Sequence, residues 1–153
     1  MTTVAYKDGI MAADRQTDVP SGNAGVTKLK RRDDAVYAGT GCSSDIAALA
    51  DWYFSNRMAL AKYTARKNDD PNAELLVMHD DGRVFWTGWG CSPSEVSGFV
   101  AIGSGAEYAV GAMARGAHPG EAVEIAARFD ESTGQGVDVA RCRHNVVKYP
   151  ESW

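Results

Sequence analysis

Three residues near the start of the chain could do chemistry together: Thr2, Asp14 and Lys28. The dipeptide Asp8-Gly9 lies between two short apolar runs, and it predicts a two-residue hairpin turn because both turn positions need positive φ. Such a turn places Asp14 opposite Thr3 and diagonal to Thr2, within the ~5–8 Å that separates cross-strand neighbours. We therefore expect a carboxylate and a hydroxyl side by side at the start of the first strand.

A threonine at the chain terminus would combine a nucleophile with a base. A starting Met is commonly removed before a small residue, and removal of Met1 would leave Thr2 with a free α-amine. That amine has a pKa near ~8, so it can accept the proton of its own hydroxyl at neutral pH. A nearby lysine would lower the pKa of the amine further, and an aspartate would hold that lysine in place. Alternatively, Thr2 only favours a strand; the hairpin alone leaves both interpretations open.

A second hairpin is predicted from residues 26–31 and 35–39, and it contains Lys28. It places Lys28 opposite Gly39, beside a glycine-rich loop that begins there. Lys30 is the alternative if the register differs by one side-chain alternation. Taken alone, the basic run around these two lysines is more typical of a solvated face.

The rest of the chain predicts two more strand pairs and three helices. Asp81-Gly82 separates residues 75–79 from 83–87, and residues 136–141 precede a further strand at 145–149. Helices are predicted from Ser43 or Ser44 to about Arg66, over 106–115 with Ser104 as cap, and over 120–129 after Pro119. Hairpins imply antiparallel sheets and amphipathic helices must cover a sheet face, so we expect an α+β fold with two antiparallel sheets and outer helices.

Composition restricts the class of protein. The 153 residues fit one domain, 1–153, and 44% apolar with 24% charged residues is ordinary for a globular chain. The net charge of −4 argues against nucleic acid or an anionic membrane as partner. No apolar stretch approaches the ~18 residues that span a bilayer, so we expect a cytoplasmic protein.

No cofactor or metal is predicted. The three cysteines form no Cys-x-x-Cys pair and have no histidine at ligand spacing. The loop Gly39-Thr40-Gly41 lacks the Lys-Ser/Thr ending of a phosphate-binding P-loop, and Gly103-Ser104-Gly105 lacks the third glycine of a dinucleotide site. Taken alone, both loops are turns that lead into helices.

Five segments together resemble the ordered signature of N-terminal-nucleophile threonine peptidases, namely the proteasome β subunits and the bacterial HslV peptidase. They run in the same order from residue 2 to about residue 140: TTVAYKDGIMAADRQT, TKLKRR, AGTGCSSD, AIGSGAEYAVGAM and DESTGQGVDV. The resemblance implies a four-layer αββα sandwich, which agrees with the element order predicted above.

The resemblance also implies roles for individual residues. Thr2 matches the nucleophile, Lys28 the essential lysine, and Asp14 the aspartate that orients this lysine. Gly41 matches the glycine whose N–H stabilises the oxyanion, where little room is left for a side chain. The remaining matches are Ser104 near the terminal amine, Asp130 and Thr133 as its support, and Thr17, Val26, Gly39 and Ser43 as substrate-binding residues.

The expected function is therefore that of a threonine-type endopeptidase acting on peptides or unfolded protein. The family implies a homo-oligomeric ring and a separate ATP-dependent unfoldase, and the small Gly39 predicts a roomy first specificity pocket. Two alternatives stay open: an inactive structural homologue that forms a ring or accessory particle, and an amidase for small substrates with the same nucleophile.

Overall fold

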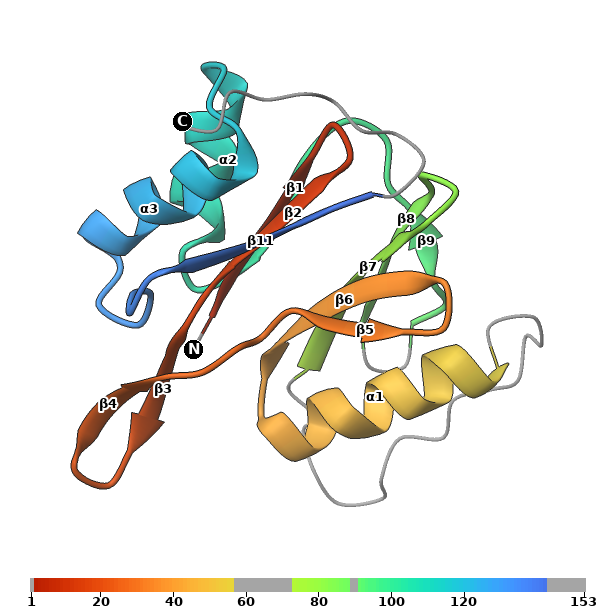
Figure 1. Cartoon of the computed structure of the whole chain (residues 1–153), viewed down its shortest axis with the longest axis horizontal. Coiled ribbons are helices and arrows are strands. Elements are labelled where there is room, and N and C mark those ends of the chain that lie inside the picture. The colour runs from red at the N-terminus through yellow and green to blue at the C-terminus, as the bar shows by residue number, and fades with distance from the viewer. Residues whose placement is uncertain (1, 57–72, 89–90, 143–153) are drawn as a thin grey trace.

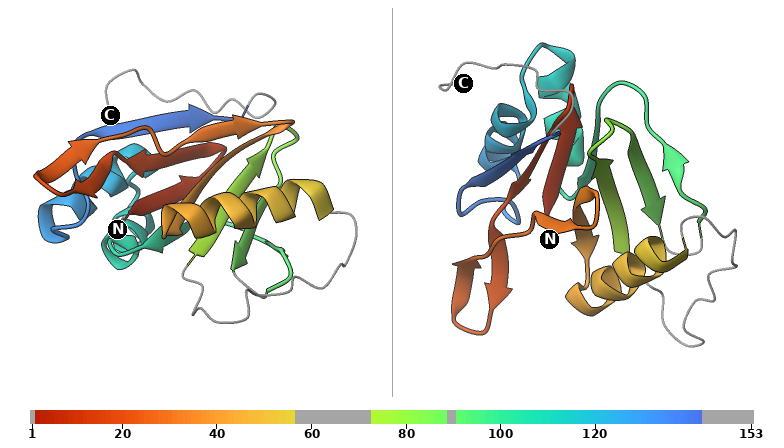
Figure 2. Two further views of the ribbon diagram at one scale, coloured as in Figure 1. Left: turned by 90° about the horizontal axis from the view of Figure 1, so that it is seen from below. Right: turned by 45° about the vertical axis from the view of Figure 1, so that its right-hand side comes forward.

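The computed structural model describes residues 2–56, 73–88 and 91–142, which form four layers (Figure 1). Two antiparallel sheets face each other in the middle. Helices α2 (Ala106–Ala114) and α3 (Pro119–Phe129) cover the outer face of one sheet, and α1 (Ser43–Asn56) covers the other (Figures 1 and 2). The predicted αββα sandwich is confirmed.

The first sheet contains the predicted N-terminal hairpin. Asp8 and Gly9 have φ values of 50° and 80°, so both turn positions are left-handed as the Asp-Gly signal requires. Lys7 pairs with Ile10, which is the predicted register. The order of the four strands is β10 (Val100–Gly103), β1 (Thr3–Lys7), β2 (Ile10–Asp14) and β11 (Val137–Arg141).

The second sheet contains the second and third predicted hairpins. Lys30 pairs with Tyr37, so the predicted register is right, but the strand begins only at Lys30 and Lys28 lies before it. Met78 pairs with Val84 across the third hairpin. The order of the five strands is β5 (Lys30–Arg32), β6 (Ala35–Gly41), β7 (Ala73–His79), β8 (Val84–Gly88) and β9 (Ser94–Glu95).

One hairpin was not predicted. Strands β3 (Gln16–Val19) and β4 (Gly22–Gly25) form a two-stranded sheet with no third strand from the described part of the chain, and they project from the sandwich (Figures 1 and 2). The sequence of β4, Gly-Asn-Ala-Gly, contains none of the β-branched or aromatic residues that identify a strand. This hairpin is nevertheless important, because it forms one wall of the cleft described below.

Two helix predictions need correction or completion. Ser104 does not cap α2: Gly105 is the N-cap residue and makes no side-chain capping bond. Pro119 does open α3, and the His118 side chain caps it by accepting the Gly120 N–H. Helix α1 is described to Asn56; its predicted continuation to Arg66 and the predicted strand 145–149 lie outside the described residues.

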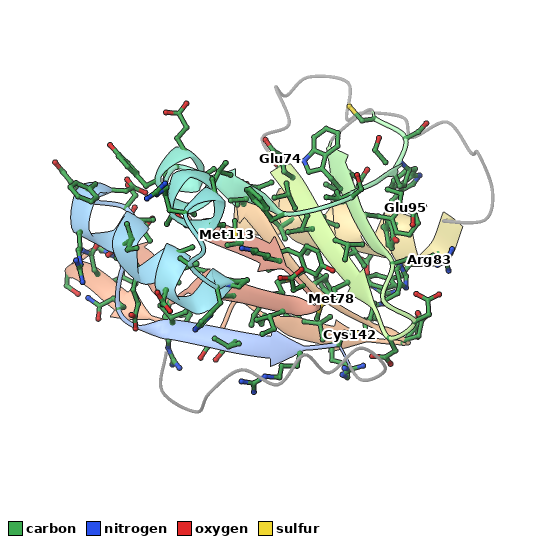
Figure 3. All side chains as sticks on the ribbon, turned by 90° about the horizontal axis from the view of Figure 1, so that it is seen from above. Glu74, Met78, Arg83, Glu95, Met113 and Cys142 are labelled. Atoms are coloured by element: carbon green, nitrogen blue, oxygen red, sulfur yellow. The ribbon has the colours of Figure 1, made fainter. Side chains whose placement is uncertain are left out.

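Apolar side chains fill all three spaces between the layers. Alternation along β1 sends Val4 between the sheets and Ala5 toward α2 and α3, where small residues let the helices lie close to the sheet. Met78 packs between the sheets and Met113 packs between α2 and the first sheet (Figure 3). Within the described ranges, no helix is long and apolar enough to cross a membrane.

Candidate active site

The three residues from which the sequence analysis began meet at one end of β1. Lys28 Nζ donates to Thr2 Oγ1 at 2.8 Å and to Asp14 Oδ1 at 3.0 Å. The Asp14 carboxylate is fully buried and the Thr2 residue is 7% exposed. The structure therefore brings a hydroxyl, an ammonium and a carboxylate together in the order that the resemblance implies, and it is Lys28, not Lys30, that contacts Thr2.

Asp14 is held by more than the lysine. Its two carboxylate oxygens accept three backbone N–H bonds in addition to the Lys28 ammonium, so the carboxylate cannot rotate away without breaking several bonds at once. The backbone donors are Thr3 at 3.0 Å, Gln16 at 3.2 Å and Gly134 at 3.1 Å. Asp14 therefore fixes the position of the Lys28 ammonium beside the Thr2 hydroxyl.

The main chain of Thr2 is fixed from the opposite side. The Ser104 N–H donates to the Thr2 carbonyl oxygen at 3.0 Å. Gly103 has a φ of 100°, and a Cβ at this position would lie 1.6 Å from the same oxygen. Only glycine allows the two strands to approach this closely.

A second hydrogen-bonded cluster lies next to Thr2 and is centred on Asp130. Ser104 Oγ and Thr133 Oγ1 each donate to Asp130 Oδ2 at 2.6 Å, and the Ser132 N–H donates to Oδ1 at 3.2 Å. Burial opposes ionisation of this carboxyl, but the hydrogen bonds from Ser104, Thr133 and Ser132 outweigh it and hold the pKa of Asp130 below its usual value.

The Asp130 cluster reaches the first strand through Thr3. Thr3 Oγ1 lies 2.7 Å from Thr133 Oγ1 and accepts the Gly105 N–H at 3.0 Å. Since Thr133 donates its proton to Asp130, Thr3 must donate to Thr133. The hydroxyls of Thr3 and Thr133 thus form a directed chain toward Asp130 beside the candidate nucleophile.

A cleft of about 400 Å³ opens beside Thr2, which is one of the residues that line it. All four predicted substrate-binding residues line this cleft, as does Gly41. Gly41 has a φ of 112°, a conformation that a residue with a side chain rarely adopts. Further lining residues, not singled out as substrate-binding from the sequence, are Asp18, Thr27, Tyr37, Cys42, Ile46, Ala47 and Asp51, together with Lys30.

Gly39 does not enlarge the cleft, contrary to the roomy first specificity pocket expected from the sequence. A Cβ on Gly39 would lie 2.6 Å from Ile46 Cγ2 and 2.9 Å from Leu75 Cδ2. The space left by the missing side chain is filled by Ile46 and Leu75, so it adds no room to the cleft. The glycine instead allows α1 to pack closely on β6.

Solved structures with similar folds are found over nearly the whole chain. BPH of Thiobacillus denitrificans is 25% identical, with a TM-score of 0.66, and the alignment covers 92% of this chain and 97% of that one. HslV of Trypanosoma brucei is 22% identical, with a TM-score of 0.69 and coverage of 92% and 98%. The chain has a proteasome-like N-terminal-nucleophile hydrolase fold. An Anbu mutant from Hyphomicrobium sp. strain MC1 is 15% identical, with a TM-score of 0.68 and coverage of 97% and 86%.

No protein-family model and no curated protein sequence matches the chain. At these identities the likeness establishes the N-terminal-nucleophile fold, and the roles of the individual residues have to be argued from the site. Over residues 2–56, 73–88 and 91–142, no group of three or more His, Cys, Asp or Glu side chains is arranged to hold a metal ion.

Sequence reasoning missed the parts of the site that depend on contacts between distant segments. Thr3 is the second of two adjacent threonines, which is a weak signal, yet its hydroxyl bonds Thr133 and its N–H bonds Asp14, so this residue links the two clusters. Gln16 joins the site through its N–H bond to Asp14 and donates from Nε2 to the Glu131 carbonyl at 2.8 Å. The sequence shows Gly103 only as part of a Gly-Ser-Gly loop. Glycine is needed at this position because the Thr2 carbonyl oxygen lies directly against its Cα.

Proposed function

We propose that the chain is a threonine-type endopeptidase of the proteasome/HslV kind, with Thr2 as nucleophile once Met1 has been removed. The observation that supports this most strongly is the 2.8 Å hydrogen bond from Lys28 Nζ to Thr2 Oγ1. Lys28 is itself held by a fully buried Asp14. A strand-favouring threonine at an ordinary chain end would need neither partner.

The chemistry follows from these positions. The free α-amine of Thr2 takes the proton of the hydroxyl, and Oγ1 attacks the peptide carbonyl carbon. The Lys28 ammonium stabilises the negative charge that develops on Oγ1, and the Gly41 N–H donates to the oxyanion of the tetrahedral intermediate. The amine then gives its proton to the leaving nitrogen, the C–N bond breaks, and an ester to Thr2 remains. Water attacks that ester by the same route and releases the acid.

The Asp130 cluster would position the α-amine of Thr2. Ser104 is tied to Asp130 by its hydroxyl and to Thr2 by its N–H. An ionised Asp130 also favours a nearby positive charge, which suits an amine that carries a proton during part of the cycle. Ser104, Asp130 and Thr133 are therefore proposed as positioning residues for the terminal amine.

We further propose that the chain assembles as a homo-oligomeric ring in the cytoplasm and receives unfolded protein from a separate ATP-dependent unfoldase. The support is the likeness to HslV and BPH over nearly their full lengths. A peptidase with broad specificity needs its sites enclosed. Native mass spectrometry would count the subunits directly.

The test combines intact mass with peptide hydrolysis. We expect the purified protein to lack Met1 and to cleave fluorogenic peptides, Thr2→Ser to retain partial activity, and Thr2→Ala to be inactive. Ser97→Ala, at an exposed position away from the cleft, is the matched control and should cleave as wild type does. Full retention of Met1 would exclude the peptidase.

The same samples discriminate the alternatives. Absence of hydrolysis by protein that has lost Met1 would indicate an inactive homologue, and turnover of a small acyl amide without peptide cleavage would indicate an amidase. A structure of BPH contains epoxomicin. Binding of epoxomicin to this chain, and its loss in Thr2→Ala, gives a readout that does not depend on the choice of peptide.

A further inference from the structure

The charges of the cleft beside Thr2 are not all neutralised. Among the residues that the structure describes, four charged ones line it: Asp18, Lys28, Lys30 and Asp51. Lys28 is paired with the buried Asp14 at 3.0 Å. Asp51 Oδ1 accepts from Arg32 Nη1 at 2.6 Å. The two remaining charges are on Asp18 and Lys30, and the direction of each side chain decides which of them acts on a bound residue.

Lys30 directs its side chain to the cleft side of the edge strand β5. It pairs with Tyr37, and directly paired residues point to the same face of a sheet. Tyr37 lines the cleft and packs with the residues under α1, so this is the face that α1 covers. In the part of the chain that the structure describes, Lys30 makes neither a hydrogen bond nor an ion pair.

Asp18 points the other way. Adjacent residues of a strand project to opposite faces, so Thr17 and Asp18 cannot both direct their side chains into the cleft. Thr17 and its partner Ala24 are half-buried, whereas Asp18 and its partner Asn23 are both exposed. Thr17 therefore faces inward, and Asp18 lies on the outer face of the hairpin.

The inner part of the cleft thus combines apolar walls with one unpaired ammonium. Ile46 and Ala47 of α1 supply apolar surface opposite Tyr37. A side chain with an apolar stem and a terminal carboxylate matches both features, because the stem covers apolar surface while the carboxylate accepts a charge-assisted bond from Lys30.

We propose that Lys30 makes this cleft selective for an acidic side chain, glutamate above all, on the residue that supplies the scissile carbonyl. This inference rests on the proposed function, since it takes the cleft beside Thr2 as the place where that residue binds. It assigns to Lys30 a role in specificity that is separate from the contact of Lys28 with the nucleophile.

The test uses peptides that differ only at the residue before the cleaved bond, which is Glu, Gln, Leu or Lys. Wild type should prefer Glu over its isostere Gln by about 10-fold in kcat/KM, because a charge-assisted bond contributes about 1.5 kcal/mol or more. Lys30→Gln should bring the ratio of kcat/KM for the Glu and Gln peptides to about one, whereas Lys30→Glu should favour the Lys peptide. Raising the salt concentration should weaken the wild-type preference.

Arg31→Gln is the matched control. Arg31 is the next residue of β5 and bonds Asp80, so the variant removes the same charge from the opposite face of the same strand. It should keep the preference for Glu. If Arg31→Gln and Lys30→Gln reduced the preference equally, general charge and not the cleft would be responsible, and the proposal would be overturned.

Binding of the same peptides to Thr2→Ala, measured by fluorescence anisotropy, separates this inference from the proposed function. Tighter binding of the Glu peptide that depends on Lys30 supports the inference even if wild type hydrolyses nothing. A preference for Leu or Lys that is unchanged in Lys30→Gln would overturn the inference while the peptidase assignment stands. Equal binding of the Glu and Gln peptides would overturn it as well.

Discussion

Replacing Asp14 should destabilise the protein far more than replacing the lysine beside it. Asp14→Ala leaves three N–H groups and the Lys28 ammonium without their acceptor. An unsatisfied buried donor costs about 1 kcal/mol or more, and the loss of a bond to a charged group about 2. The expected loss is therefore about 5 kcal/mol, which approaches the whole stability of an ordinary domain, about 5–15 kcal/mol.

Lys28→Met provides the comparison, because it keeps the apolar stem and removes only the ammonium. Removing one partner of a buried ion pair generally costs about 3–5 kcal/mol, since the remaining charge is left uncompensated. Here three N–H groups still bond Asp14, so we expect only about 2 kcal/mol. Asp14→Asn retains one acceptor oxygen and should fall between the two variants, at about 3 kcal/mol.

Urea unfolding followed by tryptophan fluorescence measures these differences, at one protein concentration and with the oligomeric state checked for each variant. The predicted order of stability is wild type, Lys28→Met, Asp14→Asn, Asp14→Ala. If Asp14→Ala does not fold, Asp14→Asn and Lys28→Met still give the comparison. A Lys28→Met loss as large as that of Asp14→Asn would refute the reasoning that backbone donors, and not the lysine, provide most of the stabilisation of this carboxylate.

Two further predictions concern other parts of the site. Because hydrogen bonds outweigh burial and hold the folded-state pKa of Asp130 below its ordinary value, the Asp130 carboxylate stabilises the fold fully above pH ~4, and this contribution is lost as the pH falls through the folded-state pKa. Stability measured between neutral pH and pH 2 should therefore drop less steeply in Asp130→Asn than in wild type, and parallel curves would contradict the assignment. Gly39→Ala should cost about 1–3 kcal/mol because its Cβ would lie 2.6 Å from Ile46 Cγ2. Ile46→Ala removes Cγ2, so in thermal unfolding it should cost less in the Gly39→Ala chain than in wild type, whereas an unrelated backbone effect at Gly39 would leave the two costs equal.

Local signals predicted the parts of the fold that local geometry determines. The Asp8-Gly9 turn fixes the register of β1 and β2, because positive φ at both positions leaves one hairpin geometry, and this placed Asp14 opposite Thr3. The β3–β4 hairpin could not be predicted in this way. The residues of β4 have low strand propensity, and the hairpin is identified only by its pairing in three dimensions.

Competition between partners explains the misassigned cap. A serine before a helix is ordinarily expected to cap it, and Ser104 has that position in the sequence. Its hydroxyl instead donates to Asp130, 26 residues later in the chain. A local preference of about 1 kcal/mol was overridden by a charge-assisted bond whose partner a local pattern does not reveal. Only the resemblance to a family paired Ser104 with Asp130 in advance.

The contacts of Thr3 and Asp14 have a consequence for the order of events during synthesis. Both belong to the first hairpin, yet Thr3 bonds Thr133 and Asp14 bonds the Gly134 N–H. The chain must therefore be synthesised at least to Gly134 before the surroundings of Thr2 are complete. An incompletely synthesised chain, or one whose later segments have not yet folded, would carry the proposed nucleophile Thr2 just before its first strand without the structure that positions it.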